Sequence, residues 1–178
     1  MRTCRGLSLL ELLTTIAVFT LLATFATPLF TDLGYDAGRA AAVNDFVHAL
    51  FLARSESLKR GSVVSLCKSA DGNICTNNAR DWSEGWMVFD NQDHDDPPMR
   101  DADEAVLQVY PGWRGGHVTS NRKAYSFRPR VQAVVNGTVV FCDPRGSATA
   151  RAIIISRTGR PRLARRDSSN KPLRCAAP

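Results

Sequence analysis

Residues 7–30 read LSLLELLTTIAVFTLLATFATPLF, an apolar run interrupted by one ionisable residue, Glu11. At about 1.5 Å per residue, a helix of this length is long enough to cross a bilayer. Arg2 and Arg5 precede the run, which predicts that the N-terminus stays in the cytoplasm and that the rest of the chain is exported. Because a carboxylate within a span is costly, Glu11 is expected to have a partner and a function.

The residues around the start of this run resemble the processing signal of type IV prepilins. In that signal a short basic leader ends in Gly, here Gly6, and an apolar residue and a Glu four places on follow, here Leu7 and Glu11. The resemblance implies that a prepilin peptidase removes residues 1–6 and methylates the amine of Leu7, although Phe is commoner there. It also implies that Glu11 pairs with the N-terminal amine of a neighbouring subunit, and it favours a kink at Pro28 over a helix end. An ordinary secretory signal is the alternative, but no convincing A-x-A site follows the run.

A helical pattern continues from Ala40 to Arg60, and Gly61 provides a stop. Its apolar residues are expected to form one stripe: Val43, Phe46, Val47, Leu50 and Leu58. His48 is expected at the surface. With residues 7–39 the pattern predicts one long helix, which the glycines of the stretch Gly34–Gly38 are expected to loosen.

After Gly61 the sequence alternates between short β-branched or aromatic segments and turns. The expected strands are Ser62–Cys67, Trp86–Asp90, Ala105–Tyr110, Tyr125–Phe127, Gly137–Cys142, Ala152–Ser156 and a short piece near Leu163. The helix should lay its apolar stripe on the sheet that these strands form, which predicts an α+β fold. The expected divisions are a leader (1–6), a membrane-spanning helix (7–30), an amphipathic helix (31–61) and a β-rich domain (62–178).

Between two of these strands, the segment Asp90–Glu104 carries seven acidic residues and one Arg. Its oxygen ligands would suit calcium, but it lacks the glycine and the spacing of an EF-hand loop. A solvated acidic loop is the interpretation that we favour, with no metal and no cofactor.

Four segments resemble the GspH/FimT family of minor pilins and pseudopilins: WSEGWMVFDNQDHDD (82–96), FRPR (127–130), TVVFCDPRG (138–146) and RAIIISRTGRPRL (151–163). Val131 departs from the resemblance, which leads us to expect Gly there. The resemblance implies a β domain of two antiparallel sheets packed with the C-terminal half of the helix.

The five cysteines are Cys4, Cys67, Cys75, Cys142 and Cys175. If Cys4 is lost with the leader, an even number remains, which suits two disulfides in an oxidising compartment. Four unrelated buried thiols are the alternative, and no pair has the spacing of a zinc site. For a domain of this family we expect Cys67–Cys75 to close a surface loop and Cys142–Cys175 to pin the tail.

The positive charge is concentrated at the C-terminus. From Arg145 onward there are nine basic residues and one acidic residue, Asp167, whereas the preceding chain has 14 basic and 16 acidic residues. This asymmetry suggests a polyanionic partner, a membrane surface or a solubilised tail.

Five arginines cluster in the sequence SRTGRPRLARR: Arg157, Arg160, Arg162, Arg165 and Arg166. Gly159 and Pro161 predict a tight, exposed loop, and guanidinium groups suit bidentate phosphate contacts. The stretch from Gly159 to Arg162 resembles the Gly-Arg-x-Arg motif of FimT proteins that bind DNA for natural transformation. Two further basic groups would extend the patch: Arg122 with Lys123, and Arg128 with Arg130.

The sequence contains no nucleophile–base motif and no phosphate loop, so we expect no enzymatic activity. The function implied is that of a minor type IV pilin that binds extracellular double-stranded DNA without sequence preference, in natural transformation. The alternatives are a purely structural minor pilin whose basic loop is solvated or docks on neighbouring subunits, and a GspH-like pseudopilin of a type II secretion system. The expected location is the inner membrane of a Gram-negative bacterium before assembly, and the pilus afterwards.

Overall fold

The computed structural model describes residues 8–76, 81–130 and 136–175, apart from the side chains of residues 25–29. Within these residues, one helix and eight strands follow each other, beginning with α1 at Leu9–Arg60. The chain divides into two compact units, residues 1–37 and 38–178, and α1 contributes to both. Gly6, Leu7 and Val131 lie outside the described residues.

The first unit contains the N-terminal part of α1, in which Glu11 is an exposed residue of the first turn. The hydroxyl groups of Thr14, Thr15, Thr20 and Thr24 each donate to the carbonyl oxygen three residues earlier, for example Thr15 Oγ1 to Leu12 O at 2.8 Å. The helix continues through Gly34 and Gly38, so these glycines do not interrupt it. Among the residues that the structure describes, no helix combines the length and the apolarity needed to cross a membrane.

In the second unit, α1 buries one face against the β domain. Val43, Phe46 and Leu50 lie on this face as expected, but Leu58 is 63 % exposed, so its placement in the stripe was wrong. At about 100° per residue, Leu58 lies about 80° around the helix from Leu50. Ser57 continues the buried face in its place, and its hydroxyl donates to Phe127 O at 2.9 Å.

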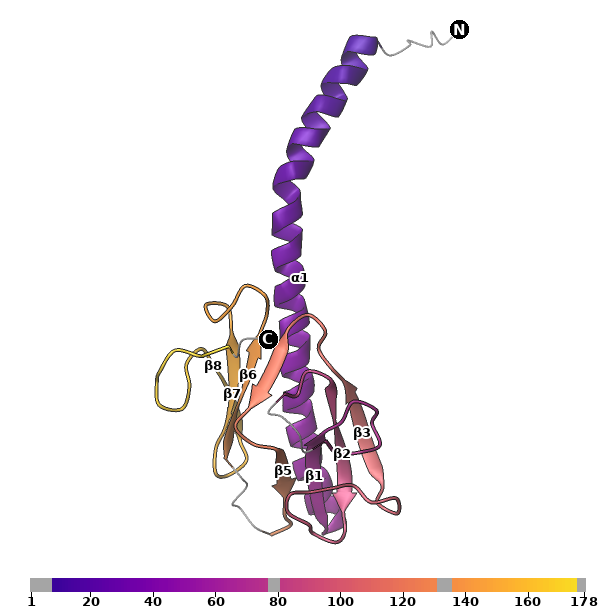
Figure 1. Ribbon diagram of the computed structural model, residues 1–178, viewed down its shortest axis with the longest axis vertical. Helices are drawn as coiled ribbons and strands as arrows, with labels where there is room; N and C mark the ends of the chain where they lie inside the picture. The colour runs from indigo at the N-terminus through magenta and orange to yellow at the C-terminus, as the bar shows by residue number, and fades with distance from the viewer. Residues whose placement is uncertain (1–7, 77–80, 131–135, 176–178) are drawn as a thin grey trace. The chain divides into compact units, whose positions relative to one another are not determined.

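Two antiparallel four-stranded sheets follow the helix, which confirms the predicted α+β fold (Figure 1). Sheet A has the order β3-β2-β1-β5, in which β1 is Val63–Lys68, β2 Gly85–Asn91, β3 Val106–Pro111 and β5 Ala124–Phe127. Sheet B has the order β4-β6-β7-β8, in which β4 is His117–Ser120, β6 Gly137–Cys142, β7 Arg151–Ile155 and β8 Pro161–Ala164. The sequence analysis did not predict β4.

The main core lies where α1 and the inner faces of both sheets meet. Phe46 is fully buried at its centre, with ring centroids 5.4 Å from Trp82 and 5.2 Å from Trp86. The same ring lies 6.1 Å from Tyr125 of sheet A and from Phe141 of sheet B. One helix side chain therefore joins aromatic residues of both sheets.

A small apolar cluster and a disulfide cover the outer face of each sheet. Cys67–Cys75 lies against Met87 and Phe89 of sheet A, and Cys142–Cys175 lies with Ala152 and Leu173 on sheet B. These are the two pairs that we expected. The second disulfide joins residues 33 apart in sequence and so holds the C-terminal tail against β6.

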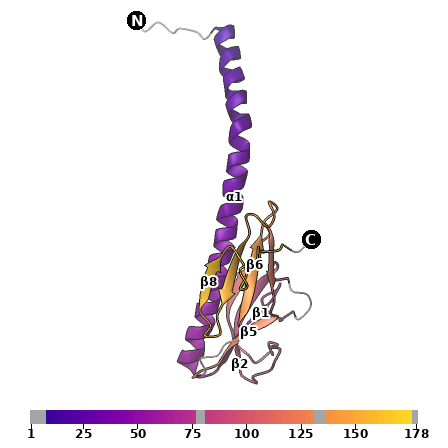
Figure 2. The ribbon, with the colours of Figure 1, turned by 90° about the vertical axis from the view of Figure 1, so that its left-hand side faces the viewer.

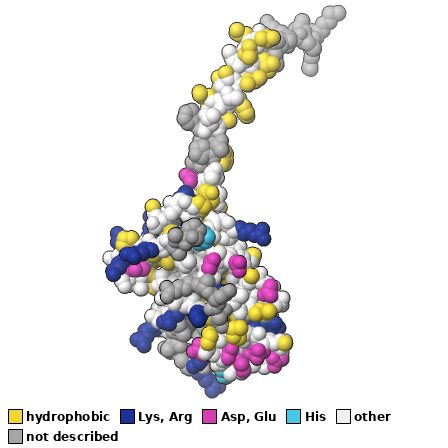
Figure 3. All heavy atoms as spheres, viewed as in Figure 1, with side chains coloured by type: hydrophobic (Ala, Val, Ile, Leu, Met, Phe, Trp, Pro, Cys, Tyr) yellow, Lys and Arg dark blue, Asp and Glu magenta, His cyan; other side chains and the backbone are white. Residues whose placement is uncertain are grey.

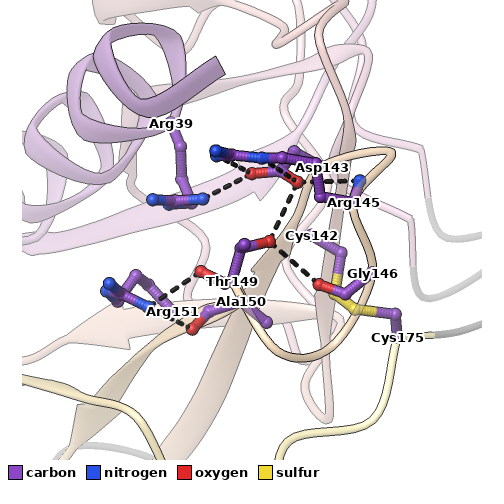
Figure 4. A network of polar contacts seen from close by, with 9 residues as sticks. All are labelled: Arg39, Cys142, Asp143, Arg145, Gly146, Thr149, Ala150, Arg151 and Cys175. Carbon is purple, nitrogen blue, oxygen red and sulfur yellow. Dashed lines mark hydrogen bonds and ion pairs between the residues drawn. A yellow bond between two sulfur atoms is a disulfide. The ribbon is translucent and has the colours of Figure 1, made fainter. Parts of the chain in front are cut away.

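A buried ion pair connects α1 to the end of β6 (Figure 4). Arg39 Nη1 donates to Asp143 Oδ2, and the side chain of Asp143 is fully buried. Arg145 Nη2 donates to the same oxygen at 2.9 Å, and Thr149 Oγ1 donates to Asp143 Oδ1 at 2.9 Å. Burial alone would raise the pKa of Asp143, but the hydrogen bonds from Arg145 and Thr149 outweigh it and hold the pKa at about 2.

This network predicts a specific loss of stability in acid. The folded-state pKa of Asp143 lies below its unfolded value, so its contribution is present above about pH 4 and is lost as the pH falls towards 2. The contribution is about 2 kcal/mol, and Asp143→Asn should remove that part of the pH dependence. Unfolding free energies of both proteins at pH 5, 3 and 2 test the prediction, which an identical pH dependence of the two would contradict.

Candidate nucleic-acid interface

Three arginines of the cluster, Arg157, Arg160 and Arg162, lie on the hairpin formed by β7 and β8, with Ser156–Arg160 as its loop. Ser156 N donates to Arg160 O at 3.1 Å, and Gly159 N donates to Ser156 O at 2.9 Å. Gly159 has a φ of 73°, in the left-handed region that glycine adopts without strain. The structure therefore contains the tight loop that the sequence predicts.

The loop is fixed by hydrogen bonds from within and from the helix. Arg54 of α1 donates from Nη1 to Thr158 O at 2.5 Å. The Ser156 and Thr158 hydroxyl oxygens are 2.9 Å apart, and Ser156 Oγ accepts from Arg160 N at 3.2 Å. Arg54 is thus a positioning residue that the sequence analysis missed, because only the fold brings α1 beside this loop.

The sheet register decides which way the β8 side chains face. Arg162 pairs with Ile154, and the flanking Leu163 pairs with Ile153 of the main core. Because successive strand residues face opposite sides, Arg162 lies on the outer face of sheet B. β8 is the edge strand of sheet B (Figure 2). Even Leu163, on the inner face of this strand, is therefore 62 % exposed.

Beyond β8, the chain forms a turn that presents two more arginines, Arg165 and Arg166. Asp167 Oδ1 accepts from the backbone N–H groups of Ser169 and Lys171, each at 2.8 Å. Arg166 Nη1 donates to Asn170 O at 3.1 Å. Arg162, Arg165 and Arg166 line a shallow pocket of about 330 Å³ between β8 and this turn.

We call the five arginines at positions 157, 160, 162, 165 and 166 the basic edge; all are exposed. In the described parts of the chain, no side-chain hydrogen bond or ion pair is found for Arg157, Arg160, Arg162 or Arg165. The nearby carboxylate of Asp167 already accepts backbone hydrogen bonds. Figure 3 shows Lys and Arg side chains on the side where β8 lies, and acidic side chains gathered at the lower right. This arrangement leaves several guanidinium groups available to an anion.

Lys123 and Arg128 do not join the basic edge. Together with Arg122 they line a different cavity of about 610 Å³, which Asp95 and Asp96 also line. The predicted DNA-binding residues are therefore divided between two places on the domain.

The acidic loop is organised by one buried side chain. Glu104 is 3 % exposed and accepts from Gln92 N at 2.6 Å and from Asp101 N at 3.0 Å. Within the described residues, no three His, Cys, Asp or Glu side chains come together as a metal site. The structural role of Glu104 was not predicted, because its sequence neighbours give no sign that it is buried.

Comparison with known proteins identifies the class. Residues 1–27 match the prokaryotic N-terminal methylation motif, and residues 42–159 match the family described as Type II transport protein GspH. The fold and this motif are those of a pilin-like protein. Because the second match covers more than half of the chain, the chain belongs to the GspH family.

Two solved structures are similar, both crystal forms of the type IV minor pilin FimU of Pseudomonas aeruginosa. The P65 form has a TM-score of 0.54 at 19 % identity and covers 77 % of this chain and 99 % of that chain. The P21 form has a TM-score of 0.54 at 20 % identity and covers 77 % and 94 %, respectively. No curated protein sequence matches this chain.

Proposed function

We propose that this chain is a minor type IV pilin that binds double-stranded DNA, without sequence preference, through its basic edge. Four exposed arginines carry the proposal, because no side-chain hydrogen bond or ion pair is found for them among the described residues. Three of them lie on the β7–β8 hairpin, whose loop accepts a hydrogen bond from Arg54 of α1, and Arg165 follows directly after β8. Exposed guanidinium groups of this kind suit the phosphate backbone, and such contacts read no base. Capture of DNA outside the cell would serve natural transformation.

Two other functions compete with this proposal. A pseudopilin of a type II secretion system is favoured by the description of the matched family, Type II transport protein GspH. A purely structural minor pilin would dock the basic edge on the acidic surface of a neighbouring subunit. Neither alternative predicts affinity for DNA.

Titration of a labelled duplex of random sequence with the purified chain tests the proposal directly. We expect a Kd of about 10⁻⁴–10⁻⁶ M at physiological salt and tighter binding at low salt. Duplexes of different sequence should bind alike. Absence of binding at low salt would refute the DNA-binding function and leave the two alternatives.

We further propose that the chain enters the pilus through residues 7–30, after insertion in the inner membrane and cleavage behind Gly6. Replacement of Gly6 by a bulky residue should leave a full-length precursor that does not assemble, because the peptidase must fit the chain beside the cut. Glu11→Val should permit cleavage but impair incorporation, because the partner of the N-terminal amine is lost. Mass spectrometry of the N-terminus checks the cleavage in each protein, and the amount of the chain in isolated pili checks incorporation. A mature N-terminus other than Leu7 would be incompatible with the proposal.

A further inference from the structure

The register of sheet B aligns a second basic group with the basic edge. Gly137 of β6 pairs with Ile155 of β7, which pairs with Pro161 of β8. One residue further out, Ser156 N donates to Arg160 O at 3.1 Å. At the opposite edge of the sheet, Arg122 Nε donates to Asn136 O at 2.8 Å. Arg122, Asn136, Ser156 and Arg160 therefore lie in one row across the end of sheet B.

This row is polar and open to solvent. All four of its residues are exposed, as is Lys123 beside Arg122. The guanidinium of Arg122 is oriented by Asn136, whose Oδ1 also accepts from Nη2 at 3.2 Å. Arg122 thus retains N–H donors beyond those that it gives to Asn136.

We propose that Arg122 and Lys123 form a second phosphate-contact site, and that one DNA duplex lies across the end of sheet B and touches this site and the basic edge together. This proposal rests on the proposed function. The two edges, β4 and β8, are three strand spacings apart, or about 14 Å. The major groove is about 12 Å wide, so the two groups are spaced to reach phosphates on both of its sides. A single-cluster site would engage fewer phosphates.

The acidic loop sets the limit of this surface. Asp95 and Asp96 line the same cavity as Arg122, Lys123 and Arg128. Their carboxylates repel phosphate, so they disfavour a path of the duplex that continues from Arg122 and Lys123 into the cavity. The proposed contact surface for the duplex therefore extends from Lys123 along the row towards Arg160.

The test compares Arg122→Ala/Lys123→Ala with a control that removes the same charge, Arg114→Ala/Arg174→Ala. The control residues are exposed and lie near His117 and Cys175, at the end of sheet B opposite the row. With the full chain in non-ionic detergent and a labelled 20-base-pair duplex, we expect the variant to raise Kd about threefold to tenfold. The slope of log K against log salt should become less negative by about two. The Kd of the control should stay within about twofold of that of wild type.

The outcomes separate this proposal from the proposed function. If wild type binds DNA and the variant binds with the same Kd and salt slope, the second site is refuted and the basic edge stands. If wild type does not bind DNA, both proposals fall. Should the double variant unfold, Lys123→Gln decides, because this exposed side chain has no hydrogen bond among the described residues; its slope should fall by about one. An unchanged slope for folded Lys123→Gln would overturn the proposal.

Discussion

Replacing Phe46 by alanine is expected to lower the free energy of unfolding by about 3–5 kcal/mol. The ring is fully buried and contacts aromatic rings from both sheets, so its removal leaves a cavity that no single element can close. The edge-to-face contacts with Trp82 and Trp86 add to the loss of apolar burial. Since small domains have only about 5–15 kcal/mol of stability, this variant should be near the limit of folding.

Phe51 provides a matched control on the same helix. It is 53 % exposed, so Phe51→Ala should change the unfolding free energy by no more than about 0.5 kcal/mol. Urea unfolding followed by tryptophan fluorescence measures both, because Trp82 and Trp86 lie beside Phe46. Equal effects of the two substitutions would show that the helix does not pack as described.

The sequence predicted the elements whose periodicity is strong and missed those whose role depends on pairing. The helix and seven of the strands were recognisable, whereas β4 was not. Its four residues, His117–Ser120, follow Gly115 and Gly116 and resemble a loop until β6 supplies their hydrogen-bond partners. Leu58 was misplaced because spacing to one neighbour does not fix the centre of a helical face.

The candidate site shows the same division. The arginine-rich stretch predicts an exposed basic loop from local chemistry alone, and the structure contains such a loop at Ser156–Arg160, whereas Arg162 lies on β8. The residues that position it could not be inferred in this way. Arg54 reaches Thr158 across a sequence separation of 104, and the alignment of Arg122 with Arg160 follows only from the register of four strands. Long-range contacts of this kind leave no signal in a local pattern.

Loss of DNA binding in Arg160→Ala/Arg162→Ala is the second large effect that we expect. Each guanidinium that neutralises a phosphate releases counterions, so removal of two should reduce the slope of log K against log salt by about two. If wild type neutralises three to five phosphates, its slope is about −3 to −4, and the variant should bind only weakly at physiological salt. All duplex sequences should be affected alike, because phosphate contacts carry no base information.

The expected loss of DNA binding depends on where the arginines lie as well as on the charge that they carry. Further variants separate these two effects. Arg114→Ala/Arg174→Ala removes the same formal charge at the opposite end of sheet B and should bind DNA nearly as wild type does. Arg162→Lys keeps the charge but loses the planar guanidinium fork, so this variant should retain only part of the affinity of wild type for DNA. Stability should be unchanged in all of these variants, because exposed arginines contribute little to it. A folded Arg160→Ala/Arg162→Ala protein with the affinity and salt slope of wild type would exclude the basic edge as a DNA site, and docking on a neighbouring subunit would become the better explanation of its arginines.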